Sequence, residues 1–111
     1  SPLRTPTSHY VLSYVERNQG VIEALFGRWA SAAEMFRKAL NIFPANASAR
    51  FLLGLAQLEL GNPKVAAKLM EECLQLDPDF KAPYVNLGVA RLRLGLYPAA
   101  AEIAAALSAA A

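Results

Sequence analysis

The chain has 111 residues, of which 55% are hydrophobic and 18% are charged, and its formal net charge is +2. This length is typical of one compact domain with its own core, and the hydrophobic fraction excludes intrinsic disorder. Charged residues interrupt every apolar run before it reaches the roughly 20 residues of a membrane span, so we expect no membrane insertion. The basic residues are spread along the chain without forming a stripe, and we therefore expect no nucleic-acid partner.

The N-terminal segment and the cysteine content say little about the cellular compartment. Residues 1–6 lack the apolar region of a secretion signal, and we expect residues 1–12 to form a partly ordered leader whose Ser8–Tyr10 part can extend the first helix. Cys73 has no second cysteine with which to form a disulfide, and we expect it to be buried as a small hydrophobic residue. The compartment stays open, with the cytoplasm slightly favoured.

A period of 34 residues organises the chain. Two glycine columns use all six glycines, and an alanine column and a proline column share their spacing: Gly20, Gly54 and Gly88; Gly27, Gly61 and Gly95; Ala32, Ala66 and Ala100; Pro44 and Pro78. Four columns of residues that share one period do not arise by chance, so the chain is built from a repeated unit.

Each unit is predicted to be a helix, a turn and a second helix. Apolar residues recur at spacings of three and four, as at Leu52, Leu55 and Leu58, which is the helical period. The glycines at 27, 61 and 95 suit the left-handed end of a helix, and the prolines at 44 and 78 stop the second helices. The spacing predicts first helices over roughly 13–26, 47–60 and 81–94, and second helices over roughly 29–42, 63–76 and 97–110.

The repeated unit resembles the tetratricopeptide repeat (TPR), which has small residues at positions 8, 20 and 27, a bulky residue at 24 and proline at 32. Position 1 of the three units is Ser13, Ala47 and Lys81. The matching residues are Gly20, Trp29, Ala32, Phe36, Ala39, Leu40 and Pro44 in the first unit, Leu53, Gly54, Ala66, Met70, Cys73, Leu74 and Pro78 in the second, and Tyr84, Leu87, Gly88, Tyr97 and Ala100 in the third. The resemblance covers about 99 residues and implies an all-α, right-handed α-solenoid of three repeats, 13–46, 47–80 and 81–111.

Two units depart from the family pattern. The first places Glu16, Gln19 and Glu23 where large core residues are usual, and the third places Ala104 at the bulky position 24. We expect the glycine and alanine columns of each unit to face each other, so that its two helices approach closely.

Residues that could support catalysis are few. His9 is the only histidine, no Cys–His pair has a useful spacing, and no phosphate-binding glycine motif is present. We interpret Glu71, Glu72, Asp77 and Asp79 as solvated surface, and we expect Asn46 to cap a helix although it begins a glycosylation sequon. The chain is therefore predicted not to be an enzyme and to carry neither a cofactor nor a metal.

The resemblance implies that the first helices line a concave groove that binds a peptide or helix of another protein. Carrying the family register over places the following residues in this groove: Tyr14, Arg17, Asn18, Val21, Phe51, Leu52, Leu55, Val85, Asn86, Val89 and Arg93. The centre is apolar, so an adaptor, scaffold or chaperone that binds an apolar segment of its partner is predicted. The alternative is that some of these side chains belong to the core.

Family members that hold the C-terminal carboxylate of heat-shock chaperones need five polar or basic groove residues. Only Arg17 matches in kind, because Val21, Leu52, Ala82 and Asn86 occupy the other four positions. A charged tail is therefore not the expected ligand. Residues 50–56 are also similar to the middle repeat of three-repeat chaperones of bacterial type III secretion, which shield apolar segments of translocator proteins.

A second class of function is self-association through the C-terminal helix. Residues 98–111 are nearly all alanine, although a terminal repeat normally needs a polar outer face. Three explanations stay open: the chain is an accessory fragment of a longer repeat protein or enzyme, another chain covers this end, or the alanine names understate the natural side chains. The sequence does not decide among them.

Overall fold

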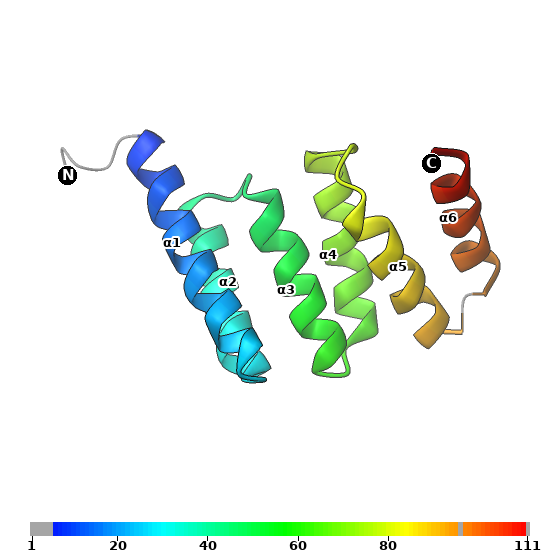
Figure 1. The fold of residues 1–111 in the computed structure, drawn as a ribbon, viewed down its shortest axis with the longest axis horizontal. Coiled ribbons are helices and arrows are strands. Elements are labelled where there is room, and N and C mark those ends of the chain that lie inside the picture. The colour runs from blue at the N-terminus through cyan, green and yellow to red at the C-terminus, as the bar shows by residue number, and fades with distance from the viewer. Residues whose placement is uncertain (1–5, 96, 111) are drawn as a thin grey trace.

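The computed structural model describes residues 6–95 and 97–110, which form six helices in three antiparallel pairs placed side by side (Figure 1). The first helices of the pairs are α1 (Pro6–Leu25), α3 (Ala47–Glu59) and α5 (Ala82–Arg93). The second helices are α2 (Trp29–Ile42), α4 (Pro63–Leu76) and α6 (Tyr97–Ala110). The prediction of an all-α stack of three helix pairs is confirmed, and the elongated molecule measures 50 × 28 × 20 Å.

Glycine ends the first helix of each pair, as predicted. Gly27, Gly61 and Gly95 have φ values of 75°, 83° and 77°, a left-handed conformation that residues with a Cβ rarely adopt. At the end of α1, the Gly27 amide donates to the Ala24 carbonyl and the Arg28 amide donates to the Glu23 carbonyl, both at 2.9 Å. These two bonds satisfy carbonyls that the helix leaves free and reverse the chain tightly into α2.

The helix pairs are joined because each second helix also packs on the next first helix, α2 on α3 and α4 on α5. Two apolar clusters form the core. One combines Ala32, Ala33 and Phe36 of α2 with Leu53 and Ala56 of α3, and the other combines Ala66, Ala67 and Met70 of α4 with Leu58, Leu87 and Ala90. A side chain in a second helix therefore stabilises its own unit and the following one.

In the first two units, the nearest neighbour of the glycine at position 8 differs from the prediction. A Cβ on Gly20 would lie 2.6 Å from Cδ1 of Phe36, and a Cβ on Gly54 would lie 2.7 Å from Cε of Met70. The bulky residue at position 24, and not the alanine at position 20, thus fills the space beside the glycine. The alanines still permit close packing, since Ala32 and Ala66 are fully buried.

The expected extension of the first helix through Ser8–Tyr10 is confirmed, and the helix begins earlier still, at Pro6. Residues 6–12, assigned above to a leader, form the first turns of α1, while residues 1–5 lie outside the described part of the chain. Aromatic contacts hold this extension: the Tyr10 ring lies 5.5 Å from the Phe43 ring and 4.8 Å from the Tyr14 ring, between centroids. The extra turns therefore have packing partners that the 34-residue pattern does not encode.

Asn46 caps α3, as predicted. Its Oδ1 accepts a hydrogen bond of 3.0 Å from the Ala49 amide, and its Nδ2 donates to Ser13 Oγ at 2.9 Å. Ser13 Oγ in turn donates to the Ala39 carbonyl at 2.7 Å. Since Asn46 is buried in this network, which links α1, α2 and α3, a glycan on it is incompatible with the folded chain.

Cys73 is buried, as predicted. It lies on α4 and its Sγ is 3.2 Å from the carbonyl oxygen of Ala47 at the start of α3. Burial raises the pKa of its thiol to about 11, and the nearby Asp77 carboxylate adds to the increase. At neutral pH the thiol is therefore protonated and poorly nucleophilic.

Candidate functional site

An apolar pocket of about 380 Å³ opens between α1 and α3 above the N-terminal half of α2. We call it the α1–α3 pocket. It is lined by Val21, Ala24 and Leu25 of α1, Trp29 and Phe36 of α2, and Leu52 and Leu55 of α3. Its volume falls within the range of roughly 300–1,000 Å³ that is common for binding pockets.

The pocket is positioned by the core beneath it. Phe36 is fully buried, and Val21, Ala24, Trp29 and Leu52 pack against the same cluster, so these side chains have little freedom to move. Leu25 behaves differently, because it ends α1 and is 81% exposed. The site therefore combines a rigid apolar base with one large apolar side chain that is free to meet a partner.

A polar cluster lies on α1, next to Val21. Nη1 of Arg17 donates to Ser48 Oγ at 2.9 Å, Nε donates to Asn18 Oδ1 at 3.1 Å, and the guanidinium lies 4.7 Å from the centre of the Tyr14 ring. Burial raises the pKa of Tyr14, and its hydrogen bond with Tyr10 adds to the effect. Within the described residues, no carboxylate forms an ion pair with Arg17.

The groove residues predicted on α5 do not line this pocket. Val85 is exposed and Val89 is half-buried, and neither is among the pocket residues. Asn86 donates through Nδ2 to the Ala82 carbonyl at 3.2 Å within its own helix. Arg93 donates to the Leu58 carbonyl at 3.1 Å and so ties the end of α3 to α5. These two polar side chains thus have bonds inside the chain.

Phe51 points toward the third repeat and not into the α1–α3 pocket. Its ring lies 5.3 Å from the Phe80 ring, between centroids, and it packs against the core cluster that contains Met70 and Leu87. The alternative interpretation of groove residues as core therefore describes Phe51 better than Leu52 or Leu55. Of the six aliphatic and phenylalanine residues predicted for the groove, the structure brings together three in this pocket: Val21, Leu52 and Leu55.

Two aromatic residues of this pocket, Trp29 and Phe36, were not among the predicted groove residues. Both were assigned to the fold because they occupy family positions on a second helix, whereas the groove register covers first helices only. The available signal was that Trp29 follows the turn directly and is the only tryptophan of the chain. Ala24 and Leu25 occupy groove positions of the family register on α1, and both line the pocket.

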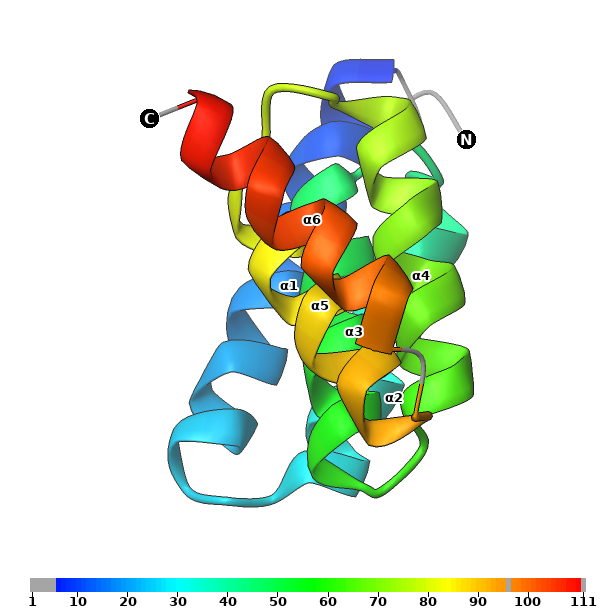
Figure 2. The same ribbon diagram turned by 90° about the vertical axis from the view of Figure 1, so that its right-hand side faces the viewer.

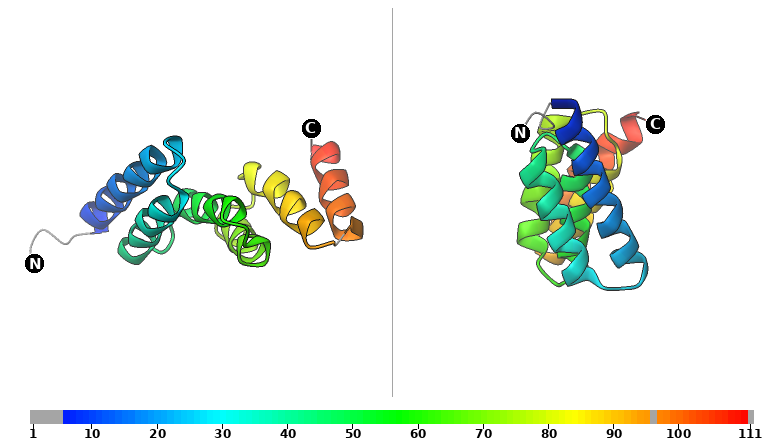
Figure 3. Two further views of the ribbon diagram at one scale, coloured as in Figure 1. Left: turned by 90° about the horizontal axis from the view of Figure 1, so that it is seen from below. Right: turned by 90° about the vertical axis from the view of Figure 1, so that its left-hand side faces the viewer.

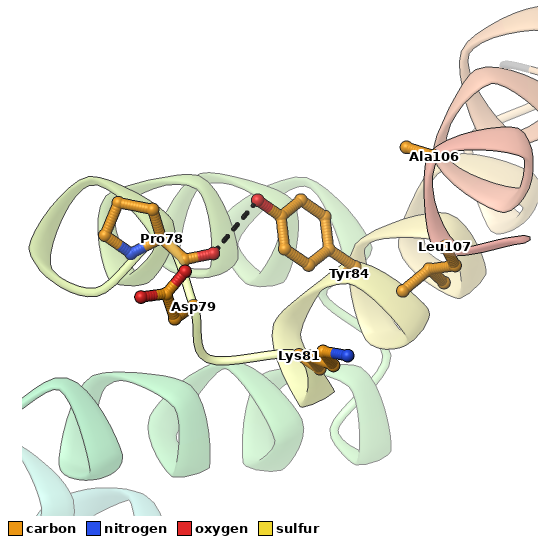
Figure 4. A pocket seen from close by; sticks show the side chains of 6 residues that line it. All are labelled: Pro78, Asp79, Lys81, Tyr84, Ala106 and Leu107. Carbon is orange, nitrogen blue, oxygen red and sulfur yellow. Dashed lines mark hydrogen bonds between the residues drawn. The ribbon is translucent and has the colours of Figure 1, made fainter. Parts of the chain in front are cut away.

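A second pocket, of about 430 Å³, lies between the start of α5 and the end of α6 (Figure 4). It is lined by Pro78, Asp79, Lys81, Tyr84, Ala106 and Leu107. The Tyr84 hydroxyl, 3.3 Å from the Pro78 carbonyl oxygen, donates to it across one wall. Because Asp79 and Lys81 form part of this wall, its lining is more polar than that of the α1–α3 pocket.

The described residues contain no group of three or more His, Cys, Asp or Glu side chains placed to hold a metal ion. The predicted surface carboxylates Glu71 and Glu72 form ion pairs with Arg91 and Arg50, at 3.1 and 3.2 Å. Along the six described helices, no segment combines the length and the apolar character that crossing a membrane requires.

Sequence comparisons agree with this architecture. Two family models, both described as tetratricopeptide repeat, match residues 26–79 and 57–111. The protein CTR9 homolog of Arabidopsis thaliana is 33% identical over 76 residues, which are 68% of this chain and 7% of that protein. The chain thus spans a small part of the length of this curated relative.

Solved structures share the arrangement of helices. The TPR domain of Arabidopsis OM64 superposes with a TM-score of 0.83 at 24% identity, covering 86% of this chain and 78% of that one. The second TPR domain of human RPAP3, solved in complex with the HSP70 peptide SGPTIEEVD, gives a TM-score of 0.82 at 21% identity, covering 86% and 79%. With the repeated glycines, the paired helices and the matching family models, these likenesses show that the chain belongs to the tetratricopeptide repeat family.

Proposed function

We propose that the chain is a protein-interaction module that binds an apolar peptide or helix segment of its partner in the α1–α3 pocket. The observation that carries this proposal is the pocket itself, in which seven apolar side chains from three helices surround one concave space. Pockets of this kind bind their ligands because binding removes apolar surface of both partners from contact with water. The exposed Leu25 adds an apolar side chain at the open edge.

Arg17 supplies a polar feature for orienting the partner. Arg17 and Val21 are four residues apart on α1, so they lie on one face about one helical turn, roughly 6 Å, from each other. Arg17 still has N–H groups beyond those that bond Asn18 and Ser48, since a guanidinium has five donors. An apolar segment with a carboxylate about one turn from its anchoring side chain is the ligand that fits this arrangement.

This proposal differs from the binding of acidic tails by RPAP3. The HSP70 peptide in the human RPAP3 complex, SGPTIEEVD, ends in three acidic residues within four. Here Val21 and Leu52 both pack against the apolar core cluster, and they offer no charge to such a tail. Arg17 alone provides one cationic contact, which suits one carboxylate better than a cluster of them.

Peptide selection and Trp29 fluorescence test the proposal. A random peptide library displayed on phage is selected on the folded chain, and each selected peptide is titrated while the emission of Trp29 is recorded. We expect apolar sequences with one acidic residue, a change in emission that saturates, and little response to the peptide SGPTIEEVD. Selection of polyacidic C-terminal sequences would contradict the proposal.

Two substitutions locate the binding site. Leu25→Glu places a charge at the exposed edge of the pocket without entering the core, and we expect it to weaken binding at least tenfold. Val65→Glu, on an exposed part of α4 away from the pocket, is the control and is expected to bind as the unmodified chain does. Equal binding by the two variants, with circular dichroism showing both to be folded, would place the site elsewhere.

A further inference from the structure

A third pocket, of about 410 Å³, lies between the start of α4 and the end of α5. These two helices pack on each other, and Figure 2 shows them side by side. α1 lies on the other side of the α3–α4 pair (Figure 3), and this pocket shares no residue with the α1–α3 pocket. Three of its six lining residues are cationic, and we call it the basic pocket. The lining residues are Lys64, Ala67, Lys68, Glu71, Arg91 and Leu94.

The α4 side of the basic pocket is one face of the helix. Lys64, Lys68 and Glu71 are spaced by four and three residues, so they form a row along this face. Ala67 lies between them and is buried in the core cluster that joins α4 to α5, which gives the pocket a fixed apolar base. The two lysines are exposed, so a partner can reach their ammonium groups.

The third cation, Arg91, is held in place from α5. Its Nη2 donates to Glu71 Oε1 at 3.1 Å, and this ion pair neutralises the one carboxylate among the lining residues. A guanidinium has five donors, so Arg91 keeps N–H groups for a ligand. Lys64 and Lys68 form no ion pair with any described residue. With three cations and one carboxylate, the lining carries a net charge of +2.

The repeated fold does not explain the two lysines. Position 22 holds Lys68 in the second repeat but Glu34 in the first and Glu102 in the third, so the motif has no need of a cation there. Like charges four residues apart repel each other and destabilise a helix, and Lys64 and Lys68 are such a pair. A bound anion would remove this repulsion. We therefore infer that the pair serves binding and not folding.

The charge of the pocket favours a phosphate group over a carboxylate. A phosphate monoester carries about −1.5 to −2 charges at pH 7 and has three acceptor oxygens, which matches the net charge of the lining, whereas a carboxylate carries only one charge. Lysine and arginine are the side chains that most often bind phosphate. None of the lining residues is aromatic, so nothing in the lining offers a ring on which a phosphotyrosine could stack.

We propose that the basic pocket binds a phosphorylated serine or threonine side chain of a partner protein. Lys64 and Lys68 bind the phosphate from α4, and Arg91 binds it from α5. Ala67 and Leu94 provide apolar contacts for the residue next to the phosphorylated one, which a free phosphate ion would leave unused. This inference does not depend on the proposed function, because the two pockets have no residue in common.

Capture on two peptide libraries tests the proposal. One library has a fixed phosphoserine in an otherwise random sequence, and the other has an unmodified serine at the same position. We expect the native chain to bind the phosphoserine library at least ten times more strongly, and the peptides that it selects are then titrated singly by fluorescence anisotropy. Equal binding to the two libraries would overturn the proposal.

Substitutions on α4 locate the phosphate site. Lys64→Glu/Lys68→Glu should weaken binding of a selected phosphopeptide at least tenfold, whereas Lys64→Arg/Lys68→Arg keeps both charges and should bind as the native chain does. Arg37→Glu/Lys38→Glu on α2 is the matched control, because it reverses two exposed cations outside the pocket and should leave binding unchanged. With circular dichroism showing all three variants to be folded, an equal loss in the control would overturn the proposal, since general attraction to positive charge would then explain the binding.

Two further ligands distinguish the source of the negative charge. Free O-phosphoserine lacks the rest of the peptide, and the selected peptide with glutamate in place of phosphoserine lacks the second charge. We expect both to bind at least ten times more weakly than the phosphopeptide. Equally tight binding of free O-phosphoserine would overturn the assignment of a protein partner in favour of a small phosphate compound. Equally tight binding of the glutamate peptide would overturn the assignment of phosphate.

Discussion

The first and third helix pairs share a glycine at the same repeat position but differ in how closely it is packed. A Cβ on Gly20 would overlap the ring of Phe36, whereas a Cβ on Gly88 would lie 3.8 Å from Cγ2 of Ile103, an ordinary contact distance. The middle pair is intermediate, because Gly54 faces the flexible end of Met70. The same residue in the same motif is thus required by packing in one repeat and merely accommodated in another.

The side chains around these glycines follow the same order. Position 24 holds Phe36, Met70 and Ala104 in the three repeats, so the side chain at this position becomes smaller from the first repeat to the third. Position 27 is fully buried as Ala39 and Cys73 but only half-buried as Leu107. Less apolar surface is therefore buried in the third pair, and we infer that stability decreases from the N-terminal to the C-terminal repeat.

The largest expected effect is the loss of Phe36. Phe36→Ala removes a fully buried ring from the first pair and from the contact of α2 with α3, and we expect it to lower the free energy of unfolding by about 3–5 kcal/mol. Leu107→Ala, in the loosely packed third pair, should cost roughly 1 kcal/mol. Urea denaturation followed by circular dichroism measures both. Equal losses would contradict the difference between the pairs.

Much of this fold was predictable because the residues that end its helices are strongly informative. Gly27, Gly61 and Gly95 adopt the left-handed conformation for which glycine is suited, and five of the six helices begin and end within one residue of the predicted positions. The first helix is the exception. Its extra turns depend on the contact of Tyr10 with Phe43, which lie 33 residues apart and share no repeat position.

The candidate site was less predictable, since a family register gives the position of a side chain but not its partner. Arg17 bonds Ser48, and Arg93 bonds the Leu58 carbonyl, so each spans two repeats. Phe51 packs on Phe80 and joins the core, although its register position equals that of a groove residue. Trp29 lines the pocket from a second helix, whereas the groove register includes only positions on first helices. Contacts between repeats decided each of these outcomes.

The next prediction concerns the ionisation of the Cys73 thiol, which occupies position 27 of the second repeat. Since the pKa of Cys73 is raised to about 11 in the folded chain, the unfolded chain releases this proton at a lower pH than the folded chain does. Stability is therefore unaffected below the ordinary thiol pKa of about 8.5 and decreases by at most about 1.4 kcal/mol per pH unit from there to about 11. Urea denaturation at several pH values, compared with Cys73→Ala, isolates this contribution.

Moving the thiol from the second helix pair to the equivalent position of the third compares the burial of position 27 in the two pairs. In a Cys73→Ala background, Leu107→Cys places the thiol at the half-buried equivalent position. We expect it to react with a disulfide reagent at pH 8 at least ten times faster than Cys73 does in the native chain, because it is more exposed and less desolvated. Equal rates would show that the two repeats bury position 27 equally.

A methyl group on the first glycine should have a smaller effect. Gly20→Ala gains about 1 kcal/mol of helix propensity but forces the new Cβ against a rigid, buried ring, an overpacking cost of about 1–3 kcal/mol. We therefore expect a net loss of about 1 kcal/mol, seen as a lower midpoint in thermal melting. Gly20→Ala combined with Phe36→Leu should recover part of the overpacking cost, since the ring is then absent. Failure to recover it would show that the ring is not the obstacle.

The smallest expected effect has the opposite sign. Gly88→Ala places its Cβ in ordinary contact with Ile103 and should stabilise α5 by roughly 0.5–1 kcal/mol, because alanine loses less backbone entropy than glycine when a helix forms. Differential scanning calorimetry of this variant beside Gly20→Ala compares the two pairs directly, with one methyl group added at equivalent positions. A higher melting temperature for Gly88→Ala and a lower one for Gly20→Ala would mean that packing against the second helix determines whether the glycine is needed. Destabilisation of similar size in both would mean that every repeat requires glycine here, and the third pair would then be as tightly packed as the first.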